Sequence, residues 1–288
     1  MSPSAVSPLV AVKALAFDVF GTTVDWRTSV IDELDLRVHR KLATTTTTIT
    51  TADAPGAAAP SPDLRERLAH LPADWTARFA DAWRASYWRF VRSQALAGLQ
   101  DASAAFKTTD AHFRDSLVEL LAGWRLTGLF SEAEVASLSM VWHRLAPWPD
   151  SAAGLARLAA APLGLRAATL SNGSAALVAD LDEFGGLGFG RLLCAEGLRA
   201  YKPAREAYEG AAKELGVRPG EVAMVAAHMA DLEAARAAGM RTVYVKRRGE
   251  EEWDDKRLEE ARAWVDLWID EEEEGFVTLA ERLEEMRA

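Results

Sequence analysis

Short apolar segments alternate with helical stretches along most of the chain, and this alternation constrains the fold more than any other feature. Each apolar segment has the length of a buried strand and is followed by residues typical of turns or of helix starts. The four clearest segments are 12–20, 166–170, 222–227 and 241–245. Strands separated by helices in this way predict one parallel sheet with right-handed crossovers.

The segments between these strands complete the predicted core. Helices are predicted at 174–184, 204–215 and 232–238, and a closing amphipathic helix at 276–286. Weaker strand candidates lie at 192–195 and, as an edge strand, at 265–269. The class is therefore α/β, with a Rossmann-like parallel sheet, and its chemistry should gather beyond the carboxyl ends of the strands.

The region 26–148 differs from the rest because it contains helical patterns but no convincing strand. Helices are indicated at 75–96, 111–124 and 132–145, and six of the ten tryptophans lie between 75 and 148, where packing is their main expected role. We predict a helical cap domain inserted into a discontinuous core formed by 1–25 and 149–288. A Thr/Ala/Pro-rich low-complexity segment at 44–62 is expected to be an exposed loop.

Composition limits the partners of such a protein. The net charge of −10 argues against sequence-blind nucleic-acid binding, since neutralising phosphates needs a basic surface. The acidic runs 250–252 and 271–274 are interpreted as solvated faces. No stretch approaches the roughly 18 apolar residues that span a bilayer, and the single cysteine, Cys194, fits a reducing compartment. We expect a cytoplasmic enzyme without membrane or nucleic-acid partners; an anionic substrate and a homodimer both stay open.

Asp18 follows the first predicted strand and precedes the turn residues Gly21 and Thr22. A carboxylate among apolar neighbours is costly to bury unless it is paired or used. From this string alone, a turn or helix-capping aspartate and a functional carboxylate are equally good interpretations.

Two further motifs lie where a predicted helix begins. Ser171 and Asn172 follow a strand, where free backbone N–H groups at a helix N-terminus bind anions, although such residues are also ordinary turn formers. Lys202 precedes Pro203, which is expected in the first turn of the next helix, and Tyr208 lies six residues beyond Lys202. A lone lysine there is usually a surface residue, unless it meets a carboxylate.

The fourth motif covers 224–231 and ends on His228 and Asp231. Asp231 could cap the following helix, and His228 could be a structural turn histidine. Neither residue by itself indicates chemistry.

Taken together and in this order, the four motifs resemble those of the haloacid dehalogenase superfamily. The resemblance covers the chain outside the Thr-rich segment and the C-terminal tail. It implies that Asp18 is a nucleophile, that Lys202 supports its charge, and that the helical insert is the cap.

Departures from the superfamily's phosphatases suggest which branch the chain resembles. Those enzymes carry an aspartate where this chain has Phe20, and a metal-binding carboxylate where it has Ala227. Because a hard cation needs several oxygen ligands, we expect neither a metal nor another cofactor. The pattern instead resembles the type II 2-haloacid dehalogenases, whose cap carries a Trp-Arg pair that Trp83 and Arg84 match. The other matches to that family's site are Thr22, Ser171, Asn172, Lys202, Tyr208 and Asp231.

The resemblance implies hydrolytic dehalogenation of a small 2-haloalkanoic acid through an ester on Asp18. Arg84 and Asn172 would stabilise the departing halide. Ser171 and Lys202, with backbone N–H groups, would hold the substrate carboxylate. The other expected substrate contacts are Thr22, Phe20, Tyr208 and His228.

Water oriented by Asp231 and His228 would hydrolyse the ester. Ala226 and His228 replace the serine and asparagine of known members. A histidine titrating near its ordinary pKa of about 6.5 would slow this step below about pH 6. The alternatives are a related hydrolase acting on another small acid, a phosphatase with weak metal binding, and a non-catalytic binding protein.

Overall fold

The structure is a computed structural model that describes residues 7–43, 59–100 and 107–288. Within these residues, five parallel strands form one sheet in the order β4-β1-β5-β6-β7. The predicted α/β class with a Rossmann-like parallel sheet is confirmed. The strands are β1 (Ala14–Phe17), β4 (Arg166–Thr169), β5 (Val222–Ala226), β6 (Arg241–Val245) and β7 (Leu267–Ile269).

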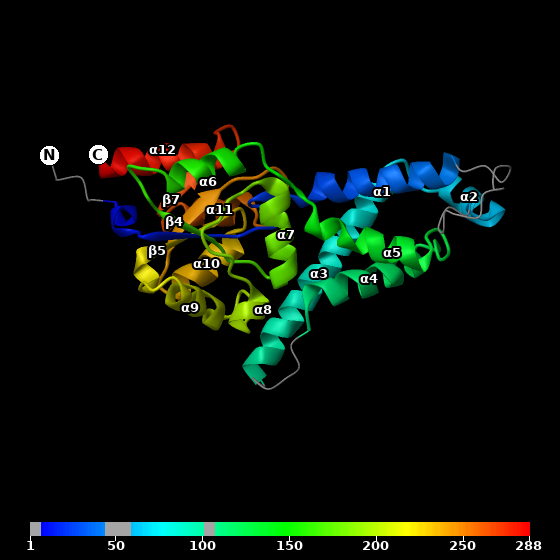
Figure 1. The fold of residues 1–288 in the computed structure, drawn as a ribbon, viewed down its shortest axis with the longest axis horizontal. Helices are drawn as coiled ribbons and strands as arrows, with labels where there is room; N and C mark the ends of the chain where they lie inside the picture. Colours follow the sequence, from blue (N-terminus) through cyan, green and yellow to red (C-terminus); the bar gives the residue numbers. More distant parts are fainter. Residues whose placement is uncertain (1–6, 44–58, 101–106) are drawn as a thin grey trace.

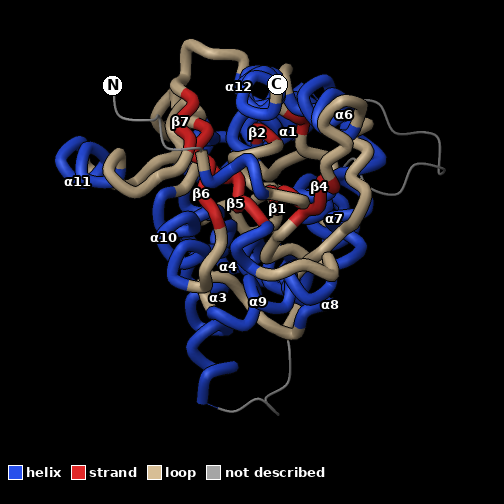
Figure 2. The backbone as a smooth tube through the Cα atoms, turned by 90° about the vertical axis from the view of Figure 1, so that its left-hand side faces the viewer, coloured by secondary structure: helices blue, strands red, loops and turns tan. Residues whose placement is uncertain are grey.

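Helices cover both faces of the sheet (Figure 2). Because alternate residues of a strand point to opposite faces, Leu15 and Phe17 pack on one side, whereas Ala14 and Ala16 pack on the other. The first face is covered by α6 (Ser151–Ala159) and α12 (Gly275–Arg287), and the second by α9 (Arg205–Glu214) and α10 (Met229–Ala237). The remaining core helices are α7 (Ala175–Gly185), α8 (Ala195–Leu198) and α11 (Asp255–Ala261).

The strand candidate at 192–195 is wrong. This segment makes only isolated bridges beside β4. The hydroxyl of Thr169 replaces part of the ladder, since it donates to the Leu193 carbonyl (2.9 Å) and accepts from the Leu193 N–H (2.8 Å). Side-chain bonds of this kind compete with regular pairing, and the chain turns into α8 at Ala195.

The helices between Trp26 and His143 form an elongated block beside the sheet domain (Figure 1). Their apolar faces share a core that includes Phe79, Leu117 and Trp142. Across the described residues, none of the helices is long and apolar enough to cross a membrane. The block consists of α1 (Trp26–Ala43), α2 (Pro62–Ala69), α3 (Trp75–Gln100), α4 (Thr109–Gly123), α5 (Glu132–Ser139) and the 3₁₀ helix η2 (Met140–His143).

A short antiparallel ribbon stands where the chain enters and leaves this block. It pairs β2 (Val24–Asp25) with β3 (Ala146–Pro147). The division into a cap at 26–148 and a core formed by 1–25 and 149–288 stays a prediction. Of the Thr-rich segment, residues 44–58 lie outside the described residues, and Pro62 already belongs to α2.

The carboxyl ends of the strands face the helical block. Phe20, which follows β1, belongs to the block's apolar core. Because β1, β4 and β5 are parallel neighbours, the residues after each of them meet at this edge. The four sequence motifs therefore converge between the sheet and the helices.

Candidate active site

Asp18 lies directly after β1, at a buried position where three hydrogen-bond donors surround its carboxylate. Oδ1 accepts from Lys202 Nζ (2.8 Å), whereas Oδ2 accepts from the Thr22 hydroxyl (2.8 Å) and faces His228 Nδ1 (3.1 Å). Burial by itself would raise the pKa of Asp18, but Lys202 and His228 outweigh it and hold that pKa well below its ordinary value. The carboxylate is therefore ionised across the physiological range.

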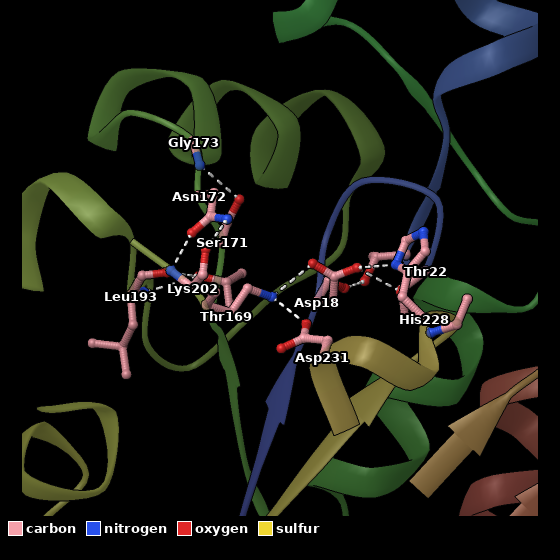
Figure 3. A network of polar contacts seen from close by, with 12 residues as sticks. Asp18, Thr22, Thr169, Ser171, Asn172, Gly173, Leu193, Lys202, His228 and Asp231 are labelled. Atoms are coloured by element: carbon pink, nitrogen blue, oxygen red, sulfur yellow. Dashed lines mark hydrogen bonds and ion pairs between the residues drawn. The ribbon is translucent and has the colours of Figure 1, made fainter. Parts of the chain in front are cut away.

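Lys202 joins Asp18 to Asp231 (Figure 3). Its Nζ donates to Asp18 at 2.8 Å and to Asp231 Oδ2 at 2.5 Å. Burial would lower the pKa of Lys202, yet the two carboxylates raise it above its ordinary value. Lys202 is thus a fixed buried cation rather than a surface lysine. Pro203 lies before the first turn of α9 and not within it, because the helix begins at Arg205.

Asn172 holds the backbone of Lys202. The Asn172 Nδ2 group donates to the Lys202 carbonyl (3.1 Å), and the Lys202 N–H donates to Asn172 Oδ1 (2.7 Å). Asn172 also lines the cavity that contains Asp18. Its contacts with Lys202 show a positioning role that the sequence did not indicate.

Asp231 does not cap α10, since the capping position is His228 and Asp231 lies inside the first turn. Asp231 accepts hydrogen bonds from Lys202 and, at 2.6 Å, from the Tyr208 hydroxyl. Burial raises the pKa of Asp231, and the charge of Asp18 adds to this effect although Lys202 opposes it. Of the two carboxylates, Asp231 is the better proton acceptor.

The contacts of His228 match neither the structural turn histidine nor the partner of Asp231 in orienting water. Its side chain contacts neither backbone nor Asp231; Nδ1 faces Asp18 Oδ2 (3.1 Å) and Nε2 faces Glu250 Oε2 (3.2 Å). Although burial lowers the pKa of His228, these two carboxylates raise it to about 9. His228 is therefore a cation at neutral pH, which contradicts the ordinary pKa on which the expected slowing of ester hydrolysis below pH 6 rested.

Glu250 is a site residue that the sequence analysis missed. Its run was interpreted as a solvated face, yet Glu250 is 8% exposed and contacts His228 and Trp26. The close approach of Glu250 explains why a glycine stands at position 21. Its φ of +80° favours glycine, and a Cβ there would lie 1.9 Å from Glu250 Oε2. No periodicity of the sequence links positions so far apart.

Arg84 reaches the site from α3. Arg84, Tyr87, Trp88 and Val91 recur at helical spacing and line the cavity that contains Asp18. The guanidinium carbon lies 4.5 Å from the ring centre of Trp88 and 4.8 Å from that of Tyr87, which are cation–π contacts. Its Nη1 atom is buried and has no hydrogen-bond partner among the described residues.

The cavity between the sheet and α3 has a volume of about 150 Å³. That is below the roughly 300–1,000 Å³ of sites for drug-sized ligands, so it suits a molecule of a few heavy atoms. Phe20 and Tyr208 belong to its wall, whereas Ser171 and Thr22 are not among the residues that line it. The Ser171 hydroxyl accepts from the Gly173 N–H (3.0 Å), so the substrate contacts expected of Ser171 and Thr22 are not part of this cavity's wall.

Among residues 7–43, 59–100 and 107–288, no group of three or more His, Cys, Asp or Glu side chains is arranged to hold a metal ion. Phe20 and Ala227, at the two positions where carboxylates were considered, are both buried apolar residues. That the protein works without a metal stays a prediction.

Comparisons with known proteins match most of the chain. Residues 12–239 match a family model described as haloacid dehalogenase-like hydrolase. The (S)-2-haloacid dehalogenase 4A of Burkholderia cepacia is 28% identical over 249 residues, which are 83% of this chain and 85% of that protein. A solved L-2-haloacid dehalogenase is 31% identical, with 94% of this chain and 99% of that chain covered and a TM-score of 0.70. A defluorinating L-2-haloacid dehalogenase is 30% identical, with coverages of 96% and 98% and a TM-score of 0.72.

Proposed function

The chain belongs to the haloacid dehalogenase-like hydrolases, and from this premise we propose that it hydrolyses a small 2-haloalkanoic acid to the 2-hydroxy acid. The family resemblance inferred from the four motifs is thereby confirmed. The relatives named above are 2-haloacid dehalogenases, and their names support the substrate class proposed here. The low identity leaves the individual acid and halogen to experiment.

The observation that carries the proposal is that Asp18 and Arg84 line the same small cavity. Asp18 is an ionised, buried carboxylate whose Oδ1 accepts one hydrogen bond from the described residues. Arg84 presents a buried Nη1 without a partner among the described residues. Displacement by Asp18 turns the leaving group into an anion. A buried N–H group without a partner, placed beside that leaving group, stabilises the negative charge as it develops.

In the first step, Asp18 Oδ1 attacks the carbon that carries the halogen. The new carbon–oxygen bond makes an ester, and the electron pair of the carbon–halogen bond leaves with the halide. Arg84 stabilises that halide. Only one of the two Asn172 Nδ2 hydrogens is needed for its bond to Lys202, so the other is proposed as a second contact. Lys202 and backbone N–H groups attract the substrate carboxylate.

In the second step, water attacks the ester carbonyl of Asp18. Asp231 accepts the proton of that water, a role that fits its raised pKa and its place beside Lys202. Apolar walls such as Trp88 and Val91 keep bulk water from the ester. The hydroxy acid then leaves with the oxygen that had been Asp18 Oδ1.

Halide release from a panel of 2-haloacids tests the proposal, with a generic phosphate ester assayed beside them. We expect halide from at least one haloacid, no phosphate release, and a rate unchanged by a chelator, since Phe20 and Ala227 replace carboxylates that would assist a cation. Ion chromatography measures the halide. A chelator-sensitive rate restored by magnesium, or phosphate release alone, would favour the phosphatase alternative.

Arg84→Lys should lower the rate of halide release by about 10- to 1000-fold, the scale for loss of one charge-stabilising donor. Lysine keeps the charge but loses the planar fork that lies against Trp88 and Tyr87. Arg89→Lys, at an exposed position of the same helix, is the matched control and should keep the parent rate. Equal rates for the two variants would make Arg84 a packing residue of the cap.

A further inference from the structure

On the side of Asp18 opposite Lys202, two donors meet a single oxygen. Oδ2 accepts from the Thr22 hydroxyl and faces His228 Nδ1, whereas Lys202 is the one donor to Oδ1 in the part of the chain that the structure describes (Figure 3). The two donors fill the hydrogen-bonding capacity of Oδ2. Oδ1 is therefore the oxygen that is available to form a bond with substrate.

Glu250 fixes the far side of the imidazole. Glu250 Oε2 lies 3.2 Å from His228 Nε2, and Oε1 accepts from Trp26 Nε1 (2.8 Å). The Glu250 side chain is 5% exposed. Its close approach depends on Gly21, where a Cβ would overlap Oε2. A buried carboxylate held this tightly has a defined orientation toward the ring.

Both ring nitrogens of His228 face carboxylate oxygens, so both must carry protons to make hydrogen bonds. The raised pKa of about 9 agrees with this geometry. The charged groups in direct contact with the ring are Asp18 and Glu250, and the edge-on ring of Trp88 covers it from α3. Across the shared cavity stand the cations Arg84, Arg92 and Lys202 and the anions Asp231, Glu251 and Glu252.

We propose that Thr22 and the His228–Glu250 pair form an oxyanion site for hydrolysis of the Asp18 ester. The inference rests on the proposed function. Thr22 and His228 touch Asp18 Oδ2, the carbonyl oxygen of the ester, whereas Glu250 is a positioning residue that keeps the second proton on His228. In this assignment, His228 serves the second step as a cationic donor rather than as a neutral partner of the water.

Hydrolysis of the ester forms one bond at Asp18 Cγ and breaks another. Water oxygen bonds to Cγ, its proton passes to Asp231, and the carbonyl electron pair moves onto Oδ2. The resulting oxyanion is held by the Thr22 hydroxyl and the His228 imidazolium. When the carbonyl re-forms, the bond from Cγ to Oδ1 breaks, and Oδ1 leaves with the hydroxy acid after taking a proton from Lys202 or Asp231. The regenerated Asp18 acid releases its proton.

Glu250 matters most in the intermediate. Once Asp18 is an ester, it no longer carries the negative charge that helps to hold the proton on His228. Glu250 is then the one carboxylate of the pair still in contact with the ring. Without it, the pKa of His228 should fall toward its ordinary value of about 6.5, and the oxyanion would face a neutral donor at pH 7.

Glu250→Gln is the sharpest test because it keeps the size of the side chain. Glutamine can still accept from Trp26 and can donate to a neutral His228, so the geometry is preserved while the charge is lost. We expect ester hydrolysis at pH 7 to slow by about 10- to 1000-fold, with halide formation in the first turnover changed much less. The ester should then accumulate as a mass increase on the intact protein.

The pH profile separates this role from a structural one. In the parent enzyme the rate of ester hydrolysis should be highest with His228 protonated and should fall as the pH rises through the pKa of His228. In the ester this pKa lies below the value of about 9 because Asp18 has lost its charge, but Glu250 keeps it above 6.5. In Glu250→Gln this limb of the pH profile, in which the rate falls with rising pH, should lie at least about one pH unit lower, toward 6.5. In His228→Asn, which has no titrating ring, the limb should disappear. Glu260→Gln, on the exposed side of α11, removes the same charge elsewhere and should behave like the parent.

Rapid-quench measurement of halide and hydroxy acid decides between the outcomes. Hydrolysis in Glu250→Gln at the parent rate, or both steps slowed equally with an unmoved pH limb, overturns the oxyanion site while leaving dehalogenation intact. If the parent protein releases no halide from any haloacid, the proposed function fails and the oxyanion assignment falls with it. Slow hydrolysis with the limb displaced supports both.

Discussion

Asp18→Ala is expected to abolish haloacid turnover, with a loss of at least about 10,000-fold, because losing a covalent nucleophile removes the route through the ester. The fold should survive. Lys202 keeps Asp231 as a partner and His228 keeps Glu250, so the substitution leaves neither buried cation unpaired. Halide release and circular dichroism measure the two effects. Asp35→Ala, at an exposed position of α1, should show neither.

Isotope labelling tests the nucleophile directly. In a single turnover of the parent protein in heavy-oxygen water, the label should enter the Asp18 carboxylate, because the hydroxy acid carries away Oδ1 and water replaces it. Mass spectrometry of the peptide that contains Asp18 detects the label. Heavy oxygen that appears in the hydroxy acid and not in Asp18 would mean that water attacks the substrate directly.

Lys202→Met should destabilise the protein by about 3–5 kcal/mol at pH 7, the cost of leaving buried charges without their partner. The Lys202 side chain is 7% exposed, so solvent screens its two ion pairs little. The rate of halide release should also fall by at least about 100-fold, because Asp18 loses a cation that keeps it ionised. Chemical denaturation measures the free energy of unfolding.

The pH dependence of that loss follows from the pKa of Asp18. In the parent protein this pKa is lowered from its ordinary value of 3.8, so the ion pair adds stability above that value and loses it as the pH falls toward the folded-state pKa. In Lys202→Met the buried carboxylates lack this cation and should take up protons more readily. The difference in unfolding free energy should therefore shrink between pH 7 and pH 4.

Lys246→Met is the matched control for this prediction. Lys246 pairs with Glu271 at 3.9 Å on the surface, where both side chains are exposed. Such pairs contribute roughly 0–1 kcal/mol, so the substitution should change the free energy of unfolding by no more than that. An equal loss in both lysine variants would contradict the role of Lys202 as a buried counter-ion.

The class of fold and the convergence of the four motifs at one edge of the sheet could be predicted from the sequence alone. Short apolar runs such as 222–227, separated by helices, admit a parallel sheet, whose strand ends meet at one edge. Asp18 and Lys202 could be singled out because polar residues at strand ends and helix starts stand out locally. The helical pattern over 75–96 likewise places Arg84, Tyr87 and Trp88 on one face of a helix, since residues three and four apart are neighbours there.

Only the tertiary structure determined which side chains of the site contact one another and which of them are charged at neutral pH. Glu250 and His228 are separated in sequence by helix α10 and strand β6, and only folding brings the Glu250 carboxylate against the ring. A sequence pattern reports burial and periodicity, whereas a pKa depends on burial and on distances to charges from several elements. For that reason the pattern indicated a solvated run at 250–252 and a neutral His228, whereas in the packed fold Glu250 is buried and the pKa of His228 is raised.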